Sequence, residues 1–439
     1  MRLMTQQVWS ERRRRSVRVT SARWQRRGIF LLGGVVVGIV AVALAVLADW
    51  AQEAFNAVLA HSRYASLVIT PAGFALSIFL TRRFFQNAQG SGIPQAIAAR
   101  QLSDQAARGR LVSIRIAVGK VLLTLLGLLC GASVGREGPT VQVGASIMFA
   151  IGRFSPRRQP GLILAGAAAG VAAAFNTPLA GIVFGIEEMS RAFETRTSGL
   201  IIAAVIAAGL TSLALVGNYS YFGSTPTMLR NGIDWLAVPI CGVVGGLAGG
   251  LFSRIVIVTA RGLPGVAGAA LKRHPVLLAA GCGLAVALCG IASGDTVYGT
   301  GYAQVKAALE GAAPLTSDFA VFKFLATVLS AVSGIPGGIF APSLAVGAGI
   351  GSDIAQLFPT APIGPIILLG MVAYFAGVVQ APITAFVIVT EMTDNHTMVV
   401  PLMAAAFIAY GTSRLVCPEG IYHALAKGYA VGPAKSAPA

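Results

Sequence analysis

Long apolar runs, broken by glycine and proline, occupy most of this chain and limit its fold more than any other feature. They lie at about 28–48, 64–81, 111–130, 143–152, 162–189, 199–216, 235–258, 276–293, 317–332, 343–357, 363–390 and 398–416. Charged residues make up only 11% of the chain, well below the proportion in soluble domains. We therefore expect an all-α polytopic membrane protein, in which the shorter runs form helices that cross the bilayer only in part.

Positive charge is distributed unevenly along the chain, whose formal net charge is +17. Besides the first 27 residues, the basic clusters lie near 153–158, 191–196, 272–273 and 414. The loops that are poor in basic residues lie near 49–62, 217–234 and 295–318. Because cytoplasmic loops carry the excess of Lys and Arg, this asymmetry predicts that both termini are cytoplasmic. No folded nucleic-acid-binding module accompanies the basic tail, so we expect it to contact anionic lipid and no nucleic acid.

The two halves of the chain are related in sequence. A shift of 203 positions aligns Lys120–Ile147 with Lys323–Ile350, and a shift of 204 aligns Leu162–Met189 with Ile366–Thr393. The identical pairs include Gly135/Gly338, Pro139/Pro342, Gly144/Gly347, Gly166/Gly370, Pro178/Pro382 and Glu187/Glu391. Matches of this kind at a nearly constant offset indicate two structural repeats. The predicted organisation is a basic cytoplasmic tail, two membrane repeats and a short cytoplasmic C-terminal tail, at 1–27, 28–225, 226–430 and 431–439.

Three loops share a design of glycine followed by proline, namely Gly90–Pro94, Gly135–Pro139 and Gly338–Pro342. Glycine lets a backbone approach a ligand and proline suits the first turn of a helix, so each loop aims N–H groups and the positive end of a helix dipole at one point. Such a site binds an anion weakly enough to release it again. For any one of these loops alone, a tight interhelical turn is the favoured interpretation. The three together, two of them related by the repeat, favour an anion site.

The second loop is unusual because it places Arg136 and Glu137 side by side within apolar sequence. Charges at membrane depth are costly and are usually functional. In the second repeat the position of Glu137 is taken by Phe340. The scaffold therefore tolerates an apolar residue there, and we interpret Glu137 as a functional addition.

These loops, together with Ile186–Met189, Glu391–Asn395 and a late Tyr422, resemble the signature sequences of the CLC family of chloride channels and proton-coupled chloride transporters. The resemblance covers about 28–430. It implies a CLC-type fold of two inverted-topology repeats with tilted and broken helices, in a homodimer with one pore per subunit. It also implies exchange of chloride for protons across the cell (inner) membrane, with a passive voltage- or pH-gated chloride channel on the same fold as the alternative.

The resemblance assigns the chloride site to residues of three segments. Ser91, followed by Gly92, and Tyr422 would supply hydroxyl groups to a central chloride ion. The backbone N–H groups of Ile339 and Phe340 would complete the site. A serine at position 91 resembles the chloride-selective members of the family.

The resemblance assigns proton coupling to two acids. Glu137 matches the gating glutamate, whose carboxylate competes with chloride when ionised and swings away when protonated. Arg136 and Gly138 would flank it at a helix N-terminus that lines the pore. Glu188 matches the internal proton-transfer glutamate of proton-coupled members, although the residues alone leave open a solvated charge at a helix end beside Arg191.

Other charged residues have less certain roles in the sequence. Glu187 is the repeat partner of Glu391, so we expect it to be structural. Lys120 and Lys323 are equivalent in the two repeats, and they either raise the anion potential of the pore or pair with acids that hold the repeats together.

The residue patterns of common enzymes and metal sites are missing from the sequence. Ser91 has no nearby base arrangement, and neither the four histidines nor the five cysteines have metal-type spacing. We therefore expect a transporter and not an enzyme, with no cofactor and no metal, whose substrates are chloride and protons.

Overall fold

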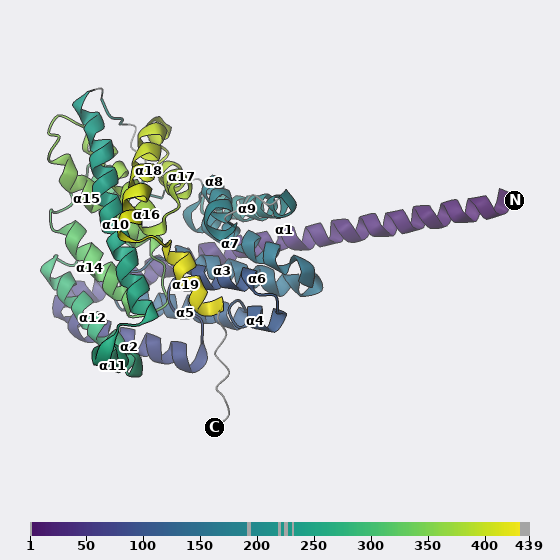
Figure 1. Ribbon diagram of the computed structural model, residues 1–439, viewed down its shortest axis with the longest axis horizontal. Coiled ribbons are helices and arrows are strands. Elements are labelled where there is room, and N and C mark those ends of the chain that lie inside the picture. Colours follow the sequence, from purple (N-terminus) through teal and green to yellow (C-terminus); the bar gives the residue numbers. More distant parts are fainter. Residues whose placement is uncertain (1, 191–194, 218–220, 224–226, 231, 431–439) are drawn as a thin grey trace.

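The computed structural model describes residues 2–190, 195–217, 221–223, 227–230 and 232–430, with side chains from Gly28 onward except at 154, 195–198, 266–267, 270–271 and 430. Helices form almost all of the regular structure in these ranges (Figure 1). The first half contains α1 (Arg2–His61), α2 (Ser66–Phe84), α3 (Ile93–Gln101), α4 (Gln105–Gly109), α5 (Ile114–Leu129), α6 (Glu137–Ile151), α7 (Gln159–Phe175), α8 (Pro178–Phe184), the π-helical turn η4 (Gly185–Ser190) and α9 (Thr195–Val216). The second half contains α10 (Ala237–Arg261), α11 (Gly265–Arg273), α12 (Pro275–Ala292), α13 (Tyr302–Leu309), α14 (Phe319–Val332), α15 (Phe340–Ala355), α16 (Ile363–Val379), α17 (Pro382–Thr393), α18 (Val399–Val416) and α19 (Ile421–Ala430).

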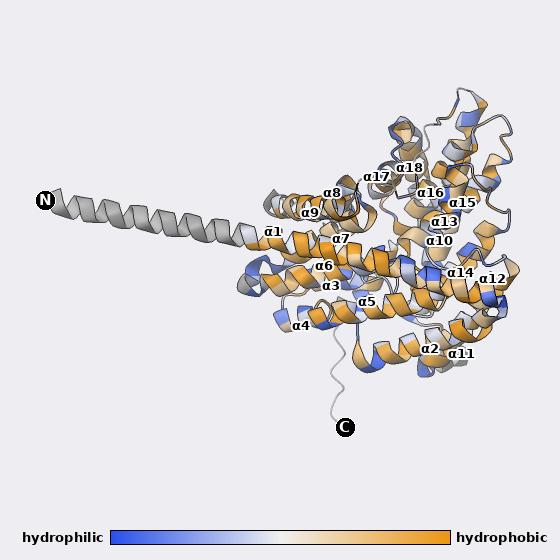
Figure 2. Ribbon diagram, turned by 180° about the vertical axis from the view of Figure 1, so that it is seen from behind, coloured by the Kyte–Doolittle hydropathy of each residue, from blue (hydrophilic) through white to orange (hydrophobic). Residues whose placement is uncertain are grey.

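Seven helices in the described ranges are long and apolar enough to cross a bilayer. Figure 2 shows apolar residues along α1, α2 and α5, with hydrophilic residues near the helix ends. The helices α6, α7, α15 and α16 are shorter, with 15 to 17 residues each. Since about 20 residues are needed to cross the hydrocarbon core, the expectation of both full and partial membrane helices is confirmed.

The first helix continues across the predicted boundary between the basic tail and the first membrane segment. α1 runs for 60 residues from Arg2 to His61, so it crosses the predicted boundary after residue 27. Residues 2–27 contain neither glycine nor proline, and such a segment can continue a helix. The side chains of the predicted basic tail, and the whole of the predicted tail at 431–439, lie outside the described residues.

The repeats predicted from the sequence recur as equivalent helix pairs. α6 packs on α7, and α15 packs on α16. Each pair crosses at equivalent glycines, because a Cβ at Gly144 would collide with the carbonyl oxygen of Gly166, and a Cβ at Gly347 with that of Gly370.

The apolar runs predicted at 162–189 and 363–390 are each broken at an equivalent position. Asn176 and Gln380 end α7 and α16 in the left-handed conformation, with φ of 56° and 59°. A proline at the first position of the next helix, Pro178 or Pro382, follows two residues later. The break produces the short helices α8 and α17, which lie against each other.

The last helix joins the two halves. α19 contacts α3 of the first half and α10 and α16 of the second, and Figure 1 shows it in yellow between these groups. Tyr422 is the second residue of α19, so this helix carries the expected tyrosine into the protein interior.

Candidate functional site

The three glycine loops meet in the interior of the protein. Gly135 N–H donates to the Gly338 carbonyl oxygen at 2.8 Å, and Gly338 N–H donates to that of Gly135 at 2.7 Å. The third loop joins them, because Gly337 N–H donates to the Gly90 oxygen at 3.1 Å, and Gly90 N–H to the Gly334 oxygen at 3.3 Å. The helices α3, α6 and α15 therefore begin close to one another.

Two glycines allow this close approach. A Cβ at Gly138 would lie 2.5 Å from Ser91 Oγ and 3.0 Å from the Cα of Gly338. Gly92 has a φ of +97° at the N-cap of α3, a conformation that side chains disfavour. Glycine at both positions therefore brings Ser91 against the start of α6.

The hydroxyls of Ser91 and Tyr422 are buried at the same place. The two side chains lie close to each other, yet neither hydroxyl forms a hydrogen bond of acceptable geometry with a described residue. Buried hydroxyls normally have a partner. Two that point to one place, beside helix N-termini, are suitable ligands for an anion.

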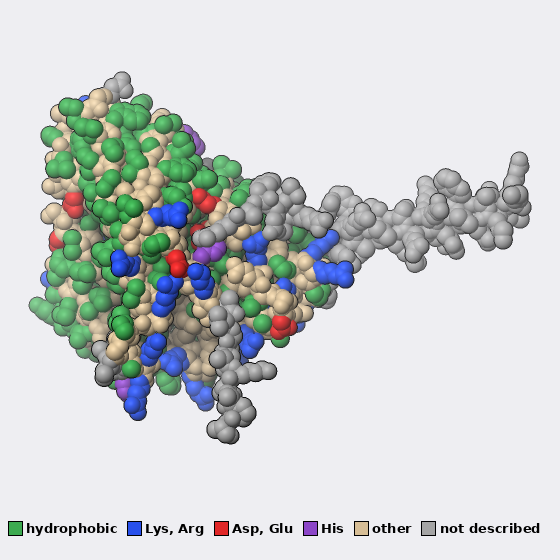
Figure 3. All heavy atoms as spheres, viewed as in Figure 1, with side chains coloured by type: hydrophobic (Ala, Val, Ile, Leu, Met, Phe, Trp, Pro, Cys, Tyr) green, Lys and Arg blue, Asp and Glu red, His purple; other side chains and the backbone are tan. Residues whose placement is uncertain are grey.

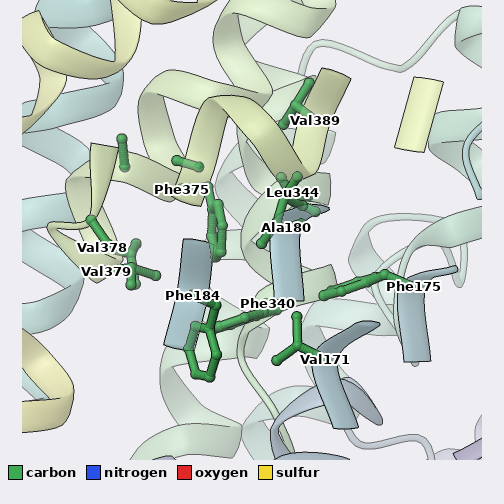
Figure 4. Packing of buried hydrophobic residues seen from close by; sticks show 14 of the residues in the cluster. Val171, Phe175, Ala180, Phe184, Phe340, Leu344, Phe375, Val378, Val379 and Val389 are labelled. Carbon is green, nitrogen blue, oxygen red and sulfur yellow. The ribbon is translucent and has the colours of Figure 1, made fainter. Parts of the chain in front are cut away.

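Ile339 and Phe340 form the start of α15, as the N-cap and first residue. The Phe340 ring packs against the rings of Phe175, Phe184 and Phe375, with centroids 6.0, 6.0 and 4.9 Å away (Figure 4). Its centroid is also 6.0 Å from that of Tyr422. This packing fixes the backbone of the first turn, whose N–H groups have no partner within the helix.

Glu137 is the first residue of α6 and is fully buried. Its Oε1 accepts a hydrogen bond of 3.2 Å from the Tyr221 hydroxyl. Its Oε2 lies against Gly135 and beside Ala341 in the first turn of α15. The carboxylate thus lies between the N-termini of α6 and α15, where their dipoles favour negative charge.

Tyr221 is a site residue that the sequence does not predict. It lies in the loop after α9, far in sequence from the glycine loops, and no motif marks it. Its ring contacts Phe175 at 5.7 Å and Tyr302 at 5.0 Å between centroids. Ring contacts therefore lead from Tyr221 through Phe175 and Phe340 to Phe184. Phe184 ends α8, four residues before Glu188.

Arg136 forms an ion pair with an acid of α1. Its Nη1 donates to Asp49 Oδ1 and to the Ala45 carbonyl oxygen, both at 2.6 Å, and its guanidinium lies 5.5 Å from the Tyr221 ring centroid. Arg136 and Tyr221 line a cavity of about 350 Å³ together with Asp49. The direct side-chain partner of Arg136 is therefore Asp49, and the cavity is bordered by Tyr221, which donates to Glu137.

Glu188 lies in the π-helical turn η4 and is 2% exposed. Its Oε1 is 3.6 Å from His423 Nε2. The alternative of a solvated charge at a helix end is wrong, because the side chain is buried. Arg191, its expected neighbour in that alternative, lies outside the described residues.

Glu187 and Glu391 cap each other's repeat. Glu391 accepts hydrogen bonds from the N–H groups of Leu179 and Ala180 in α8, at 3.1 and 2.7 Å. Glu187 accepts bonds from the N–H groups of Ile383 and Thr384 in α17, at 3.1 and 2.6 Å. The geometry agrees with the structural role expected from the repeat.

Lys120 and Lys323 are both fully buried. Lys120 Nζ donates to the Gly90 carbonyl oxygen at 2.8 Å, and Lys323 Nζ donates to those of Val297 and Gly299, each at 2.8 Å. The alternative in which they pair with acids is wrong, since their hydrogen-bond partners are backbone carbonyls. Each lysine therefore fixes the glycine loop that precedes α3 or α13.

Known proteins resemble this chain over most of its length. The family described as voltage gated chloride channel matches residues 73–414. An H(+)/Cl(-) exchange transporter ClcA of Yersinia pseudotuberculosis is 33% identical over 424 residues, covering 89% of this chain and 85% of the relative. A protein of the same name from Citrobacter koseri is 31% identical over 402 residues, covering 84% and 81%.

Solved structures share the fold. A slow cyanobacterial Cl-/H+ antiporter has a TM-score of 0.77 and 26% identity, covering 93% of this chain and 99% of the other. A CLC-type fluoride/proton antiporter has a TM-score of 0.78 over 91% and 97% of the two chains, and at 23% identity it shows the fold alone. The sequence match, the repeated helix pairs and the shared fold agree, and this chain belongs to the voltage-gated chloride channel family, the CLC family.

Proposed function

We propose that this protein is a secondary active transporter that exchanges chloride for protons. The observation that carries the proposal is the pair of buried acids: Glu137 lies between the N-termini of α6 and α15, and Glu188 lies beside His423 of α19. The relatives at 33% and 31% identity are both named as exchange transporters. A passive channel needs no second buried acid, so Glu188 favours exchange over the channel alternative.

Chloride binding is assigned to the point where the loops meet. The hydroxyls of Ser91 and Tyr422 and the N–H groups of Ile339 and Phe340 hold the ion, while Gly92 and Gly138 let the loops approach. These donors carry no full positive charge, so the ion is held weakly enough to leave.

Glu137 couples the two substrates. When ionised, its carboxylate occupies the end of α15 and competes with chloride there. When protonated it is no longer held by the helix dipoles and yields its place. Arg136, fixed by Asp49, keeps positive charge at the cavity through which anions reach this gate. Glu188 supplies and receives the protons on the other side.

A flux assay in liposomes tests the proposal. The purified protein is reconstituted with high internal chloride, and external chloride is lowered while the external pH is recorded. We expect chloride efflux to drive proton uptake when valinomycin and equal K+ on both sides carry the compensating charge, and a protonophore then to abolish the pH change. Chloride efflux without proton movement would contradict exchange and favour the channel.

The charge distribution supports an orientation in the cell (inner) membrane with both termini in the cytoplasm. Figure 3 shows Lys and Arg side chains gathered around the end of α19. Arg261, Arg414 and Lys427 line cavities beside this helix, and Arg82 and Lys272 line another. Since basic residues favour the cytoplasmic side, we assign this face to the cytoplasm and the cavity at Arg136 to the outside.

A homodimer with one pore per subunit is also part of the proposal. α8 has 7 residues and α17 has 12, too few to cross a bilayer. Leu179 and Ile383, at their exposed ends, are 62% and 42% exposed beside the capping acids. Helix ends and carboxylates facing lipid are costly, so a second copy of the chain covers this face.

The assignment of repeats to 28–225 and 226–430, with tails at 1–27 and 431–439, completes the proposal. Equivalent helix breaks and reciprocal caps support the two repeats. The tail at 1–27 orients the first helix by its positive charge and contacts anionic lipid.

A further inference from the structure

His423 lies between Glu188 and the cytoplasmic face. It follows Tyr422 in α19, and its Nε2 is 2.8 Å from the backbone oxygen of Glu188 and 3.6 Å from Oε1 of the same residue. A carbonyl oxygen can only accept a hydrogen bond. Nε2 therefore carries a hydrogen, and that N–H also lies near the carboxylate.

The His423 ring borders a cavity to which the Glu188 carboxylate is less exposed. The cavity has a volume of about 780 Å³ and is lined by both His423 and Glu188. The side chain of His423 is 17% exposed, and that of Glu188 only 3%. A proton from the cytoplasm thus meets the imidazole before it meets the carboxylate.

Several charged groups surround the ring, and most have partners of their own. On η4, Glu187 caps α17. On α3, Arg100 Nη1 donates to the Met189 carbonyl oxygen at 3.1 Å. On α18, Arg414 Nη1 donates to the Tyr410 hydroxyl at 3.2 Å. At the start of α19, Glu419 pairs with Arg261 of α10 and Lys427 of α19, at 2.8 and 2.9 Å.

We propose that His423 is a proton relay between the water of this cavity and Glu188. The inference rests on the proposed function, in which Glu188 is the internal proton carrier. Imidazole suits the task because it gains and loses a proton near neutral pH and can do so at either ring nitrogen. The neighbouring carboxylates, lysine and arginines normally titrate far from neutrality.

The relay moves one proton at a time. Nδ1 takes a proton from a hydronium ion in the cavity, and the N–H bond at Nε2 breaks as its proton passes to Oε1 of the ionised Glu188. The ring ends neutral with its hydrogen on Nδ1, and Glu188 ends protonated. Exchange with cavity water returns the hydrogen to Nε2. The same steps occur in reverse order when a proton moves from Glu188 to the cytoplasm.

The test separates a relay from a hydrogen bond that only holds η4 in place. His423→Gln keeps an amide N–H that can donate to the Glu188 carbonyl, but it cannot relay a proton. His423→Ala leaves room for free imidazole in the buffer. Lys427→Gln is the matched control, since it changes a titratable residue of the same cavity that pairs with Glu419. Proton and chloride fluxes are measured together in liposomes from pH 5 to pH 8.

We expect His423→Gln to lower the proton flux per chloride by about tenfold at pH 7, below the usual effect of about 100-fold or more for a positioned acid–base group because cavity water can still reach Glu188. Its proton flux should also fall more steeply with rising pH than that of the wild type, because hydronium must then donate to Glu188 directly. Millimolar imidazole should restore the proton flux of His423→Ala. Lys427→Gln should keep the wild-type ratio.

The relay is wrong if His423→Gln keeps the wild-type proton flux per chloride and the wild-type pH dependence of that flux. It is also wrong if imidazole fails to restore the proton flux of His423→Ala. Glu188→Gln distinguishes this failure from that of the proposed function. If Glu188→Gln abolishes proton coupling while His423→Gln does not, only the relay is wrong. If Glu188→Gln retains coupled proton flux, the assignment of Glu188 is wrong and the relay is wrong with it.

Discussion

At the scale of single residues, the proposed coupling of the two substrates rests on the position of the Glu137 carboxylate. It lies between two helix N-termini and is held by the Tyr221 hydroxyl. A negative charge placed where an anion should bind is a competitor of that anion. Protonation removes the charge, so the occupancy of the site by chloride and the protonation of Glu137 are linked.

Neutralising the gate should uncouple the two fluxes. Glu137→Gln keeps the size of the side chain but cannot carry a proton or compete as an anion. We expect chloride flux to persist while proton flux falls below detection in the liposome assay. Glu391→Gln, which neutralises an acid of a helix cap, is the control and should remain coupled. Proton-coupled transport by Glu137→Gln would show that another group carries the protons.

Tyr221 should set how strongly the carboxylate competes. Tyr221→Phe removes its hydrogen bond to Oε1, and a hydrogen bond to a charged group contributes about 1.5–3 kcal/mol. We expect the chloride concentration for half-maximal flux from the outer side to fall by about tenfold, a change worth roughly 1.4 kcal/mol.

Tyr302→Phe is the matched control for this change, because Tyr302 lines the same cavity and contacts the Tyr221 ring. It should leave the concentration dependence of chloride flux close to that of the wild type. Equal concentration dependence in Tyr221→Phe and the wild type would mean that the hydroxyl does not hold the carboxylate.

At the scale of helices, the reciprocal caps stabilise the contact between α8 and α17. Each of Glu187 and Glu391 satisfies two N–H groups at the start of the other repeat's short helix. A lost cap costs about 1 kcal/mol. Glu391→Gln should therefore lower the unfolding temperature in detergent by a few degrees and leave proton coupling intact. Loss of coupling at an unchanged unfolding temperature would contradict the structural role.

The docking of α19 depends on pH through Glu419. Hydrogen bonding from Lys427 and the charge of Arg261 lower the pKa of Glu419. A lowered pKa in the folded state stabilises the protein above the usual glutamate pKa, and this stability is lost as pH falls through the lowered value. The side chain is 43% exposed, so screening limits the effect to about 1 kcal/mol or less.

This predicts that Glu419→Gln lowers the unfolding temperature at pH 7 and lowers it less at pH 3, because the wild-type carboxylate takes up protons as pH falls. Thermal unfolding in detergent at both pH values measures the difference, and high salt should reduce it at pH 7. A larger effect at low pH would contradict the role of this ion cluster.

The elements show how far sequence reasoning reaches. Hydropathy predicts the membrane helices, and the repeat predicts that the loops of Gly135 and Gly338 are equivalent. It does not predict that they exchange hydrogen bonds, because the contact joins residues about two hundred positions apart. Tyr221 and His423 carry no local pattern at all, and only the folded chain brings them to Glu137 and Glu188. Nor does the sequence predict the length of α1, since the polar residues before Gly28 show no apolar helical period.

At the scale of the whole molecule, the proposed dimer accounts for the short helices of one face. We expect the detergent-solubilised protein to have a protein mass of about twice 45.0 kDa by light scattering. Leu179→Arg places a charge on the exposed surface of α8 and should shift the mass to that of a monomer, whereas Leu122→Arg on the exposed surface of α5 should not. A monomeric wild-type protein would contradict the dimer and leave the pore assignment unaffected.

The central claim is that chloride and proton movements are coupled within one protein, and the reversal potential in a planar bilayer tests it most directly. With a fixed chloride gradient, the pH on one side is changed and the voltage of zero current is recorded. An exchanger must shift this voltage with the pH gradient, because protons move with the chloride current. We predict such a shift in the wild type and its loss in Glu137→Gln. A wild-type reversal potential that stays at the chloride equilibrium potential at every pH gradient would contradict the account.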